Sequence, residues 1–176
     1  MFLELSVIAV GIVVSFFLKD VNFLALNVSF FNTGLIYPDF LLIFLIFFAL
    51  NKGEFSGIWI GFFAGLLEDS AILSFSQATH EFVPIIGTHA IIYTITGFIL
   101  GKINRIVDRE SLAPMMVVSL VTTFAVRVLT WILMGIIVDF NKSYSFIGPA
   151  IFTAIISPIW FTLLSWLYRI KPEERV

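Results

Sequence analysis

The sequence predicts an all-α polytopic membrane protein: six transmembrane helices that pack as one integral membrane domain over residues 1–176. Two observations lead to this fold class. Of the 176 residues, 60% are hydrophobic and only 12% are charged, whereas soluble domains contain about 45–50% and about 25%. The mean hydropathy is +1.06. In water such a chain would expose far more apolar surface than soluble monomers normally carry, so soluble fold classes are excluded.

The length sets the number of helices. A helix that crosses about 30 Å of hydrocarbon needs about 20 residues, so the chain supplies about six spans and almost nothing for a water-soluble domain. The apolar runs place these spans at residues 2–18, 35–50, 55–73, 84–101, 112–138 and 149–168.

The first two spans differ in how they begin. Residues 2–18 lack a basic start and are followed by no convincing small-residue cleavage site, so we interpret this run as a retained span rather than a signal peptide. Residues 19–33 mix Asn, Ser and Thr with apolar residues, which favours an interfacial loop. The run 35–50 contains Pro38, a residue tolerated near a helix start, and residues 51–54 predict a tight turn after it.

The remaining spans are longer or more polar. The span 55–73 meets an acidic pair at residues 68–69 before its hydropathy fades, and a polar loop follows. Residues 84–101 lead into a charged segment, and the long run 112–138 contains an arginine. The last span, 149–168, includes Pro158, which predicts a kink.

The distribution of Lys and Arg predicts the orientation, because cytoplasmic loops carry an excess of these residues. With six spans, the side that holds both termini also holds seven of the ten basic residues, and the opposite side holds two, Lys19 and Lys142. Both termini are therefore expected in the cytoplasm. The seven are Lys52, Lys102, Arg105, Arg109, Arg169, Lys171 and Arg175.

Glycines at intervals of four residues mark two helix faces. Residues four apart stack on one side of a helix, and glycines there let another helix backbone approach closely. We expect these faces to serve packing within the bundle or contact with a partner. They comprise Gly57, Gly61 and Gly65 in the third span and, more loosely, Gly97 and Gly101 in the fourth, which follow His89 and Tyr93 at the same interval.

Four polar residues are expected at one depth in the membrane. At 1.5 Å of rise per residue, Asp39, Asp69 and Arg127 lie about 18–22 Å from the cytoplasmic ends of their spans, and His89 lies about 7–8 Å below the outer face. Ionisable residues are costly in hydrocarbon and normally face a partner or a cavity. We therefore predict an internal polar cluster in the outer leaflet, with Arg127 paired to Asp69 or Asp39.

This cluster has two interpretations, and the residues alone leave both open. One is a structural ion pair that fixes the helix registry. The other is a polar cavity, open to the outside, that receives a ligand or the side chain of a partner.

Catalytic, metal-binding and nucleic-acid-binding classes find little support. The chain has no Cys and only two His, and His80-Glu81 is not followed by a second His at zinc-protease spacing. There is no Gly-x-Ser-x-Gly motif. Glu68 and Asp69 could act as an acid–base pair, but neighbouring residues point about 100° apart on a helix. The net charge of −2 gives no basis for nucleic-acid binding. We expect no enzyme activity, metal or cofactor.

One stretch of the chain resembles a known family. The order and spacing of its elements from about residue 35 to 101 resemble the bacterial rod shape-determining protein MreD family, although residues 70–85 form a longer and more polar loop than that pattern. The elements are Pro38-Asp39-Phe40-Leu41-Leu42, Gly57, Gly61-Phe62, Gly65-Leu66-Leu67-Glu68-Asp69, Ile86-Gly87, Ala90, Gly97 and Gly101.

The resemblance implies a non-enzymatic scaffold of the bacterial elongation machinery in the inner membrane. Such a protein would be embedded among membrane lipids and would bind the single-span protein MreC. It would help to couple MreB filaments to the peptidoglycan polymerase and transpeptidase. The family is also similar in fold to the S-components of energy-coupling-factor vitamin transporters, which are six-helix bundles with an outward-facing pocket.

That second similarity supplies an alternative function, a substrate-binding transport subunit. The S-component family docks its transport partner through Ala-x-x-x-Ala in the first helix. The corresponding run here, Ala9-Val10-Gly11-Ile12-Val13, does not match. The scaffold is therefore the favoured prediction.

Overall fold

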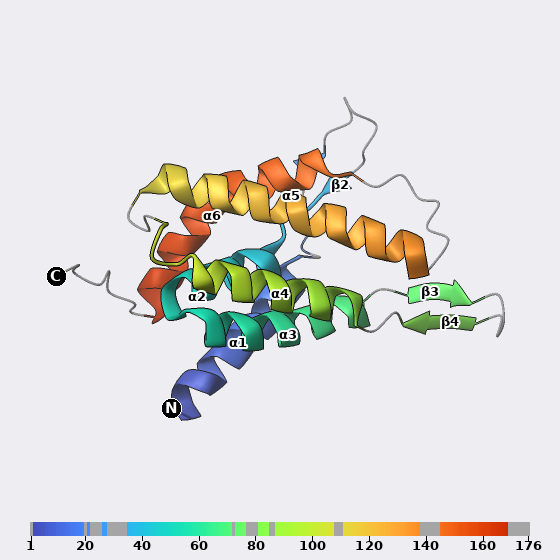
Figure 1. Ribbon diagram of the computed structural model, residues 1–176, viewed down its shortest axis with the longest axis horizontal. Coiled ribbons are helices and arrows are strands. Elements are labelled where there is room, and N and C mark those ends of the chain that lie inside the picture. The colour runs from blue at the N-terminus through green and yellow to red at the C-terminus, as the bar shows by residue number, and fades with distance from the viewer. Residues whose placement is uncertain are drawn as a thin grey trace.

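The protein is a helical bundle with two small antiparallel strand pairs, one of which projects from an end of the bundle (Figure 1). The computed structural model describes residues 2–19, 21, 26–27, 35–71, 73–76, 81–84, 87–107, 111–137 and 145–168. Within these residues the helices are α1 (Phe2–Leu18), α2 (Phe40–Lys52), α3 (Glu54–Ser70), α4 (Thr88–Lys102), α5 (Leu112–Ile137) and α6 (Ile147–Tyr168). The strands are β1 (Leu26–Asn27), β2 (Leu35–Ile36), β3 (Leu73–Ser76) and β4 (Glu81–Pro84).

The six helices match the predicted spans to within about two residues, except at the start of α2, the end of α3 and the start of α4. The second span was expected from residue 35, whereas residues 35–36 belong to β2, which pairs with β1. The helix starts only at Phe40, because the side chain of Asp39 caps it by accepting a hydrogen bond from the backbone N–H of Leu42 at 2.9 Å. At its other end, Gly53 alone separates α2 from α3 and has a φ of 86°, as the predicted tight turn requires.

The loop between the third and fourth spans contains strands that the sequence analysis did not predict. The helix α3 ends at Ser70 rather than residue 73, and α4 begins at Thr88 rather than residue 84. Between them β3 pairs antiparallel with β4 in a four-residue register from Leu73↔Pro84 to Ser76↔Glu81. Figure 1 shows this hairpin projecting from the end of the bundle. The all-α assignment therefore describes the bundle but not this hairpin.

The centre of the bundle is α2. Every residue from Phe40 to Leu50 is buried, and the helix contacts α1, α3, α4, α5 and α6. A helix that is apolar on all sides is expected to be enclosed, and this sequence has no polar residue between Phe40 and Leu50. The remaining helices therefore form a shell around α2.

Aromatic rings fill the space between α2 and the two terminal helices. Tyr168, near the end of α6, packs its ring against Phe44 and Phe48 at centroid distances of 6.1 and 4.9 Å. Its hydroxyl donates to the backbone carbonyl of Val7 in α1 at 3.0 Å. Gly11 makes this approach possible, because a Cβ there would overlap the Tyr168 hydroxyl and the Phe44 ring. The last turn of α6 thus ties α1 to α2.

The outward faces of the helices are apolar along much of their length. Within the described residues, Ala113–Ile136 and Ile147–Tyr168 are long and apolar enough to cross a membrane, with mean hydropathies of 2.0 and 1.8. Ser6–Leu18 and Phe40–Lys52 are shorter apolar helices. Exposed large apolar side chains occur on every helix except α2, for example Val10, Phe17, Phe55, Trp59, Ile95, Ile136, Ile159 and Trp166. A surface of this kind is suited to lipid rather than to water.

Several predicted features lie outside the described residues. They include most of the interfacial loop 19–33, the side chain of His80, the loop that carries Lys142, and the basic residues Arg109, Arg169, Lys171 and Arg175.

Candidate functional site

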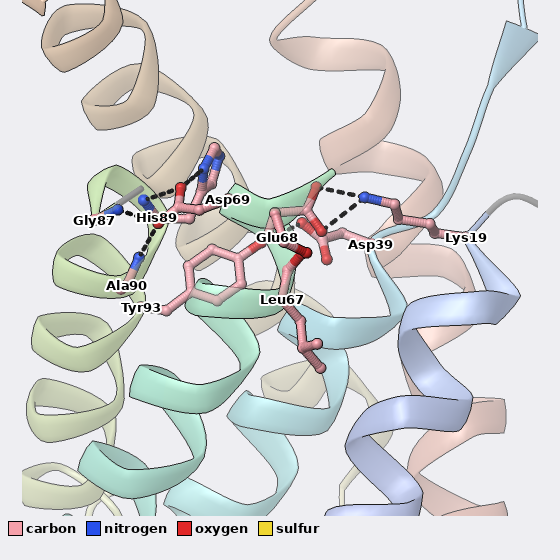
Figure 2. Close-up of polar contacts among 10 residues, drawn as sticks. Lys19, Asp39, Leu67, Glu68, Asp69, Gly87, His89, Ala90 and Tyr93 are labelled. Atoms are coloured by element: carbon pink, nitrogen blue, oxygen red, sulfur yellow. Dashed lines mark hydrogen bonds and ion pairs between the residues drawn. The ribbon is translucent and has the colours of Figure 1, made fainter. Parts of the chain in front are cut away.

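A group of polar side chains lies at the end of the bundle where α1 and α3 end and where α2 and α4 begin (Figure 2). It contains three of the four residues predicted to form a polar cluster, Asp39, Asp69 and His89. The structure adds Tyr93 and the ion pair of Lys19 with Glu68. These six side chains define the outer polar group.

Asp69 acts as a cap for a helix that starts 19 residues after it in the chain. Its Oδ2 accepts from the backbone N–H groups of Gly87 at 2.8 Å and Ala90 at 3.1 Å, and its Oδ1 accepts from the N–H of His89 at 2.8 Å. The first N–H groups of a helix have no partner within the helix, and the residue at the N-cap of α4, Gly87, has no side chain to offer. The carboxylate of Asp69 is fully buried and supplies the missing acceptor. Its negative charge also interacts favourably with the positive end of the helix dipole.

The side chain of His89 provides the fourth hydrogen bond to this carboxylate. Its Nδ1 lies 2.8 Å from Oδ1 of Asp69, and because an ionised carboxylate can only accept, Nδ1 carries the hydrogen. The imidazole also packs edge-on against the ring of Tyr93, with centroids 5.8 Å apart. Asp69 therefore receives four hydrogen bonds from one turn of α4, which fixes α3 and α4 relative to each other.

Asp39 is the second helix-capping carboxylate of the group. Besides capping α2, its Oδ2 accepts from the hydroxyl of Tyr93 at 3.1 Å. Its own backbone N–H donates to Oγ1 of Thr153 in α6 at 3.1 Å. One residue thus joins the start of α2 to both α4 and α6. Tyr93 is the link between the two carboxylates, since it touches His89 on one side and Asp39 on the other.

The ion pair of Lys19 and Glu68 lies on the α1 side of the group (Figure 2). The Nζ of Lys19 is 2.9 and 3.0 Å from the two carboxylate oxygens of Glu68, and both side chains are 20% exposed. Lys19 comes directly after the end of α1, and Glu68 is in the last turn of α3. The pair therefore anchors the end of α1 to α3.

The fourth predicted residue, Arg127, forms its hydrogen bond outside the group. Its Nη1 donates to the backbone carbonyl of Ser145 at 2.9 Å, which connects α5 to the residues just before α6. The predicted pairing of Arg127 with Asp69 or Asp39 is wrong. The Asp69 oxygens accept from Gly87, His89 and Ala90. The Asp39 oxygens accept from Leu42 and Tyr93. Only side chains were considered as partners in the sequence analysis, and Arg127 was therefore chosen. Most of the donors are instead backbone N–H groups at a helix N-terminus, which have no partner within the helix.

The five predicted glycines form the contact between α3 and α4. A Cβ on Gly57 would overlap the carbonyl of Gly97, and one on Gly61 would overlap the carbonyl of Tyr93. Likewise, a Cβ on Gly65 would overlap the backbone of Ala90, and one on Gly101 would overlap the backbone of Glu54. The two helices run antiparallel in backbone contact, so the glycine faces serve packing within the chain. The other predicted role, contact with a partner, is not open to faces that are already covered.

Lys19 and Glu68 were mentioned in the sequence analysis but were not predicted to form an ion pair. Lys19 was used only to set the topology, and Glu68 was considered only as one half of an acid–base pair. Their position in the sequence could have indicated the ion pair, because each directly follows an apolar run and the two runs end at the same end of the bundle. Tyr93 had the signal of a four-residue interval between His89 and Gly97, which places all three on one helix face.

The chemistry of the outer polar group is that of capping and charge pairing. Among the described residues, no three His, Asp or Glu side chains are placed to hold a metal ion. The carboxylate oxygens of Asp39 and Asp69 accept hydrogen bonds from helix amides, a hydroxyl and an imidazole. These contacts are those of the structural interpretation, in which the group fixes the registry of α1, α2, α3, α4 and α6.

One comparison with known proteins identifies relatives of this chain. A family model described as rod shape-determining protein MreD matches residues 5–170. No curated protein and no solved structure gives a significant match, so the similarity in fold to transporter S-components stays a prediction.

Proposed function

This chain belongs to the rod shape-determining protein MreD family, and from this we propose that it is a multi-pass scaffold of the elongation machinery in the bacterial inner membrane. The family has a role in rod shape determination and consists of membrane proteins rather than enzymes. The match extends over residues 5–170, so it includes all six helices except the first three residues of α1. This coverage is the observation that carries the proposal.

The arrangement of charged and apolar side chains supports a six-span topology with both termini in the cytoplasm. Lys52, Lys102 and Arg105 lie at one end of the bundle, where the Gly53 turn approaches the side chain of Asn104. At the opposite end Lys19 is neutralised by Glu68. Apolar side chains cover the helix faces between these ends. Basic residues concentrated at one end of an apolar bundle are typical of the cytoplasmic side.

Single cysteines test this topology directly, because the native chain contains none. In spheroplasts, Ser76→Cys in the β3–β4 hairpin is expected to react with a membrane-impermeant maleimide. Asn104→Cys, in the loop after α4, is expected to react only after the membrane is permeabilised. Labelling of Asn104→Cys in intact spheroplasts would contradict the proposed orientation, and the cysteine-free chain is the control for background labelling.

The proposed partner is an MreC-like protein with a single membrane span, through which the scaffold would meet the polymerase, the transpeptidase and, indirectly, MreB. The apolar side chains exposed on α1, α3, α4, α5 and α6 support this, because a single apolar helix can pack against them within the bilayer. The transport-subunit alternative is not favoured, since the matching family determines cell shape.

Affinity purification of the tagged protein from its native membranes tests this partner. We expect a single-span MreC-like protein to copurify in stoichiometric amounts, and we expect depletion of the chain to convert rod-shaped cells into round ones. A tagged membrane protein of unrelated function, expressed at the same level, controls for nonspecific recovery. Recovery of a pair of ATPases with a bound vitamin, in cells that keep their shape, would contradict the scaffold and indicate a transport subunit.

A further inference from the structure

The buried face of α5 is unusually rich in hydroxyl groups. Its fully or nearly buried residues are Ser119, Thr122, Thr123, Val126, Thr130 and Met134. Most of them recur at intervals of three or four, which places them on one side of the helix. The corresponding residues of α2 are all apolar. The interface that joins α5 to the rest of the bundle is therefore chemically different from the core around α2.

Three of these hydroxyls are buried without a hydrogen bond to any described residue. They are the hydroxyls of Ser119, Thr123 and Thr130, with residue exposures of 0%, 0% and 4%. We call these three residues the hydroxyl face of α5. Other hydroxyls in the same bundle do find acceptors: Ser157 Oγ donates to the carbonyl of Ala154 at 2.9 Å, and Thr162 Oγ1 to that of Pro158 at 2.9 Å.

Enclosing unsatisfied hydroxyls is unfavourable, since each buried donor or acceptor without a partner is strongly disfavoured relative to its hydrated form. Buried polar groups in folded proteins are nearly always satisfied by protein atoms or by ordered water. On the neighbouring helix α6, Nε1 of Trp160 is a further buried donor without a hydrogen-bond partner in the described part of the chain. The closed packing of α5 shown here is therefore opposed by several polar groups at once.

We propose that α5 also adopts a position slightly further from the bundle, in which ordered water molecules bind along its hydroxyl face. Water fits this chemistry because each hydroxyl both donates and accepts, and because the three groups are neutral. From Ser119 to Thr130 the face extends about 16 Å, and both of these residues lie about 10 Å from an end of α5. Water therefore has a short path to the face from either end of the helix.

The contacts of α5 are consistent with such a movement. It packs mainly against α6, less against α4 and least against α2. Its main apolar contribution to the core is Val126, with Met115, Val118 and Leu133 partly buried beside it. A small outward movement of α5 would thus disturb few apolar contacts of the core.

X-ray radiolysis of the protein in lipid nanodiscs tests the proposal, because radicals formed from bound water oxidise the side chains next to it. The reporter is Met134, which is buried and lies one turn from Thr130. We expect oxidation of Met134 in the native chain and a several-fold decrease in the double variant Thr123→Val/Thr130→Val. Ser157→Ala, which removes a hydroxyl already bonded within the protein, is the matched control and should leave the oxidation of Met134 unchanged.

The stability of Thr123→Val gives a second, independent readout. If water binds the hydroxyl face, removal of one hydroxyl takes a hydrogen-bond partner from that water, and the folding equilibrium constant should fall about five- to tenfold. In a permanently dry interface the apolar replacement of the same shape would be neutral or stabilising. Unchanged oxidation of Met134 in the double variant, or an unchanged or increased stability of Thr123→Val, would overturn the proposal.

Discussion

Replacement of Asp69 by asparagine is expected to lower the free energy of unfolding by about 3–5 kcal/mol. The carboxylate accepts four hydrogen bonds, two at each oxygen, from the backbone and the imidazole at the start of α4. Asparagine has the same shape but only one accepting oxygen, so its NH₂ group would face two N–H donors. Those donors would remain buried without partners, and each such group costs about 1–3 kcal/mol.

The measurement is unfolding of the purified protein in mixed micelles by increasing SDS, followed by circular dichroism. The adjacent Glu68→Gln provides the matched control, because it makes the same chemical change in a side chain that is 20% exposed and paired with Lys19. Solvent still reaches this pair, and the amide oxygen of glutamine can go on accepting from Lys19, so Glu68→Gln should cost about 1 kcal/mol, clearly less than Asp69→Asn. Equal stabilities of the two variants would show that Asp69 is not required as a cap.

Gly61→Ala is expected to cost about 3 kcal/mol, at the upper end of the range for overpacked cores. The added Cβ would overlap the carbonyl of Tyr93 and would also approach the backbone of Thr94, so no side-chain rotation can make room for it. The helices α3 and α4 would have to separate, which would strain the Asp69 cap at one end of their contact. The same SDS titration measures the loss.

Gly135→Ala is the control for this effect. A Cβ at Gly135 meets no other atom within 4 Å, and alanine is favoured over glycine in a helix by about 1 kcal/mol. We therefore expect Gly135→Ala to be neutral or slightly stabilising. If Gly61→Ala behaved in the same way, the close contact of α3 with α4 could not be a main determinant of stability.

The helices were largely predictable from the sequence, because apolar runs and their polar ends report directly on burial. The errors occurred at helix starts. Hydropathy continues through residues 35–39 and 84–87, whereas the helices begin only where Asp39 and Asp69 provide caps. The cap of α4 is not visible in its own sequence, since the capping residue comes from the end of α3. The β3–β4 hairpin was missed because the sequence analysis assigned its polar residues to a loop.

The candidate site was predictable in its depth but not in its pairing. Estimates from 1.5 Å of rise per residue placed Asp39, Asp69 and His89 in one layer, and the structure joins them through Tyr93. A depth estimate has no rotational information, so it could not show that Arg127 is directed toward Ser145. It also gave no weight to backbone N–H groups, which supply three of the four hydrogen bonds of Asp69.

The enclosure of α2 has a consequence for biosynthesis. Part of the cover of α2 comes from α6, which contributes Trp160 and Phe161 against Phe40 and Phe47 and leaves the ribosome well after α2. In the proposed six-span topology, one side of α2 therefore faces lipid until α6 is inserted. Because lipid tails are as apolar as the side chains that later replace them, this helix can remain in the bilayer without a chaperone for its surface. An all-round apolar sequence thus allows the central helix to be made early and enclosed last.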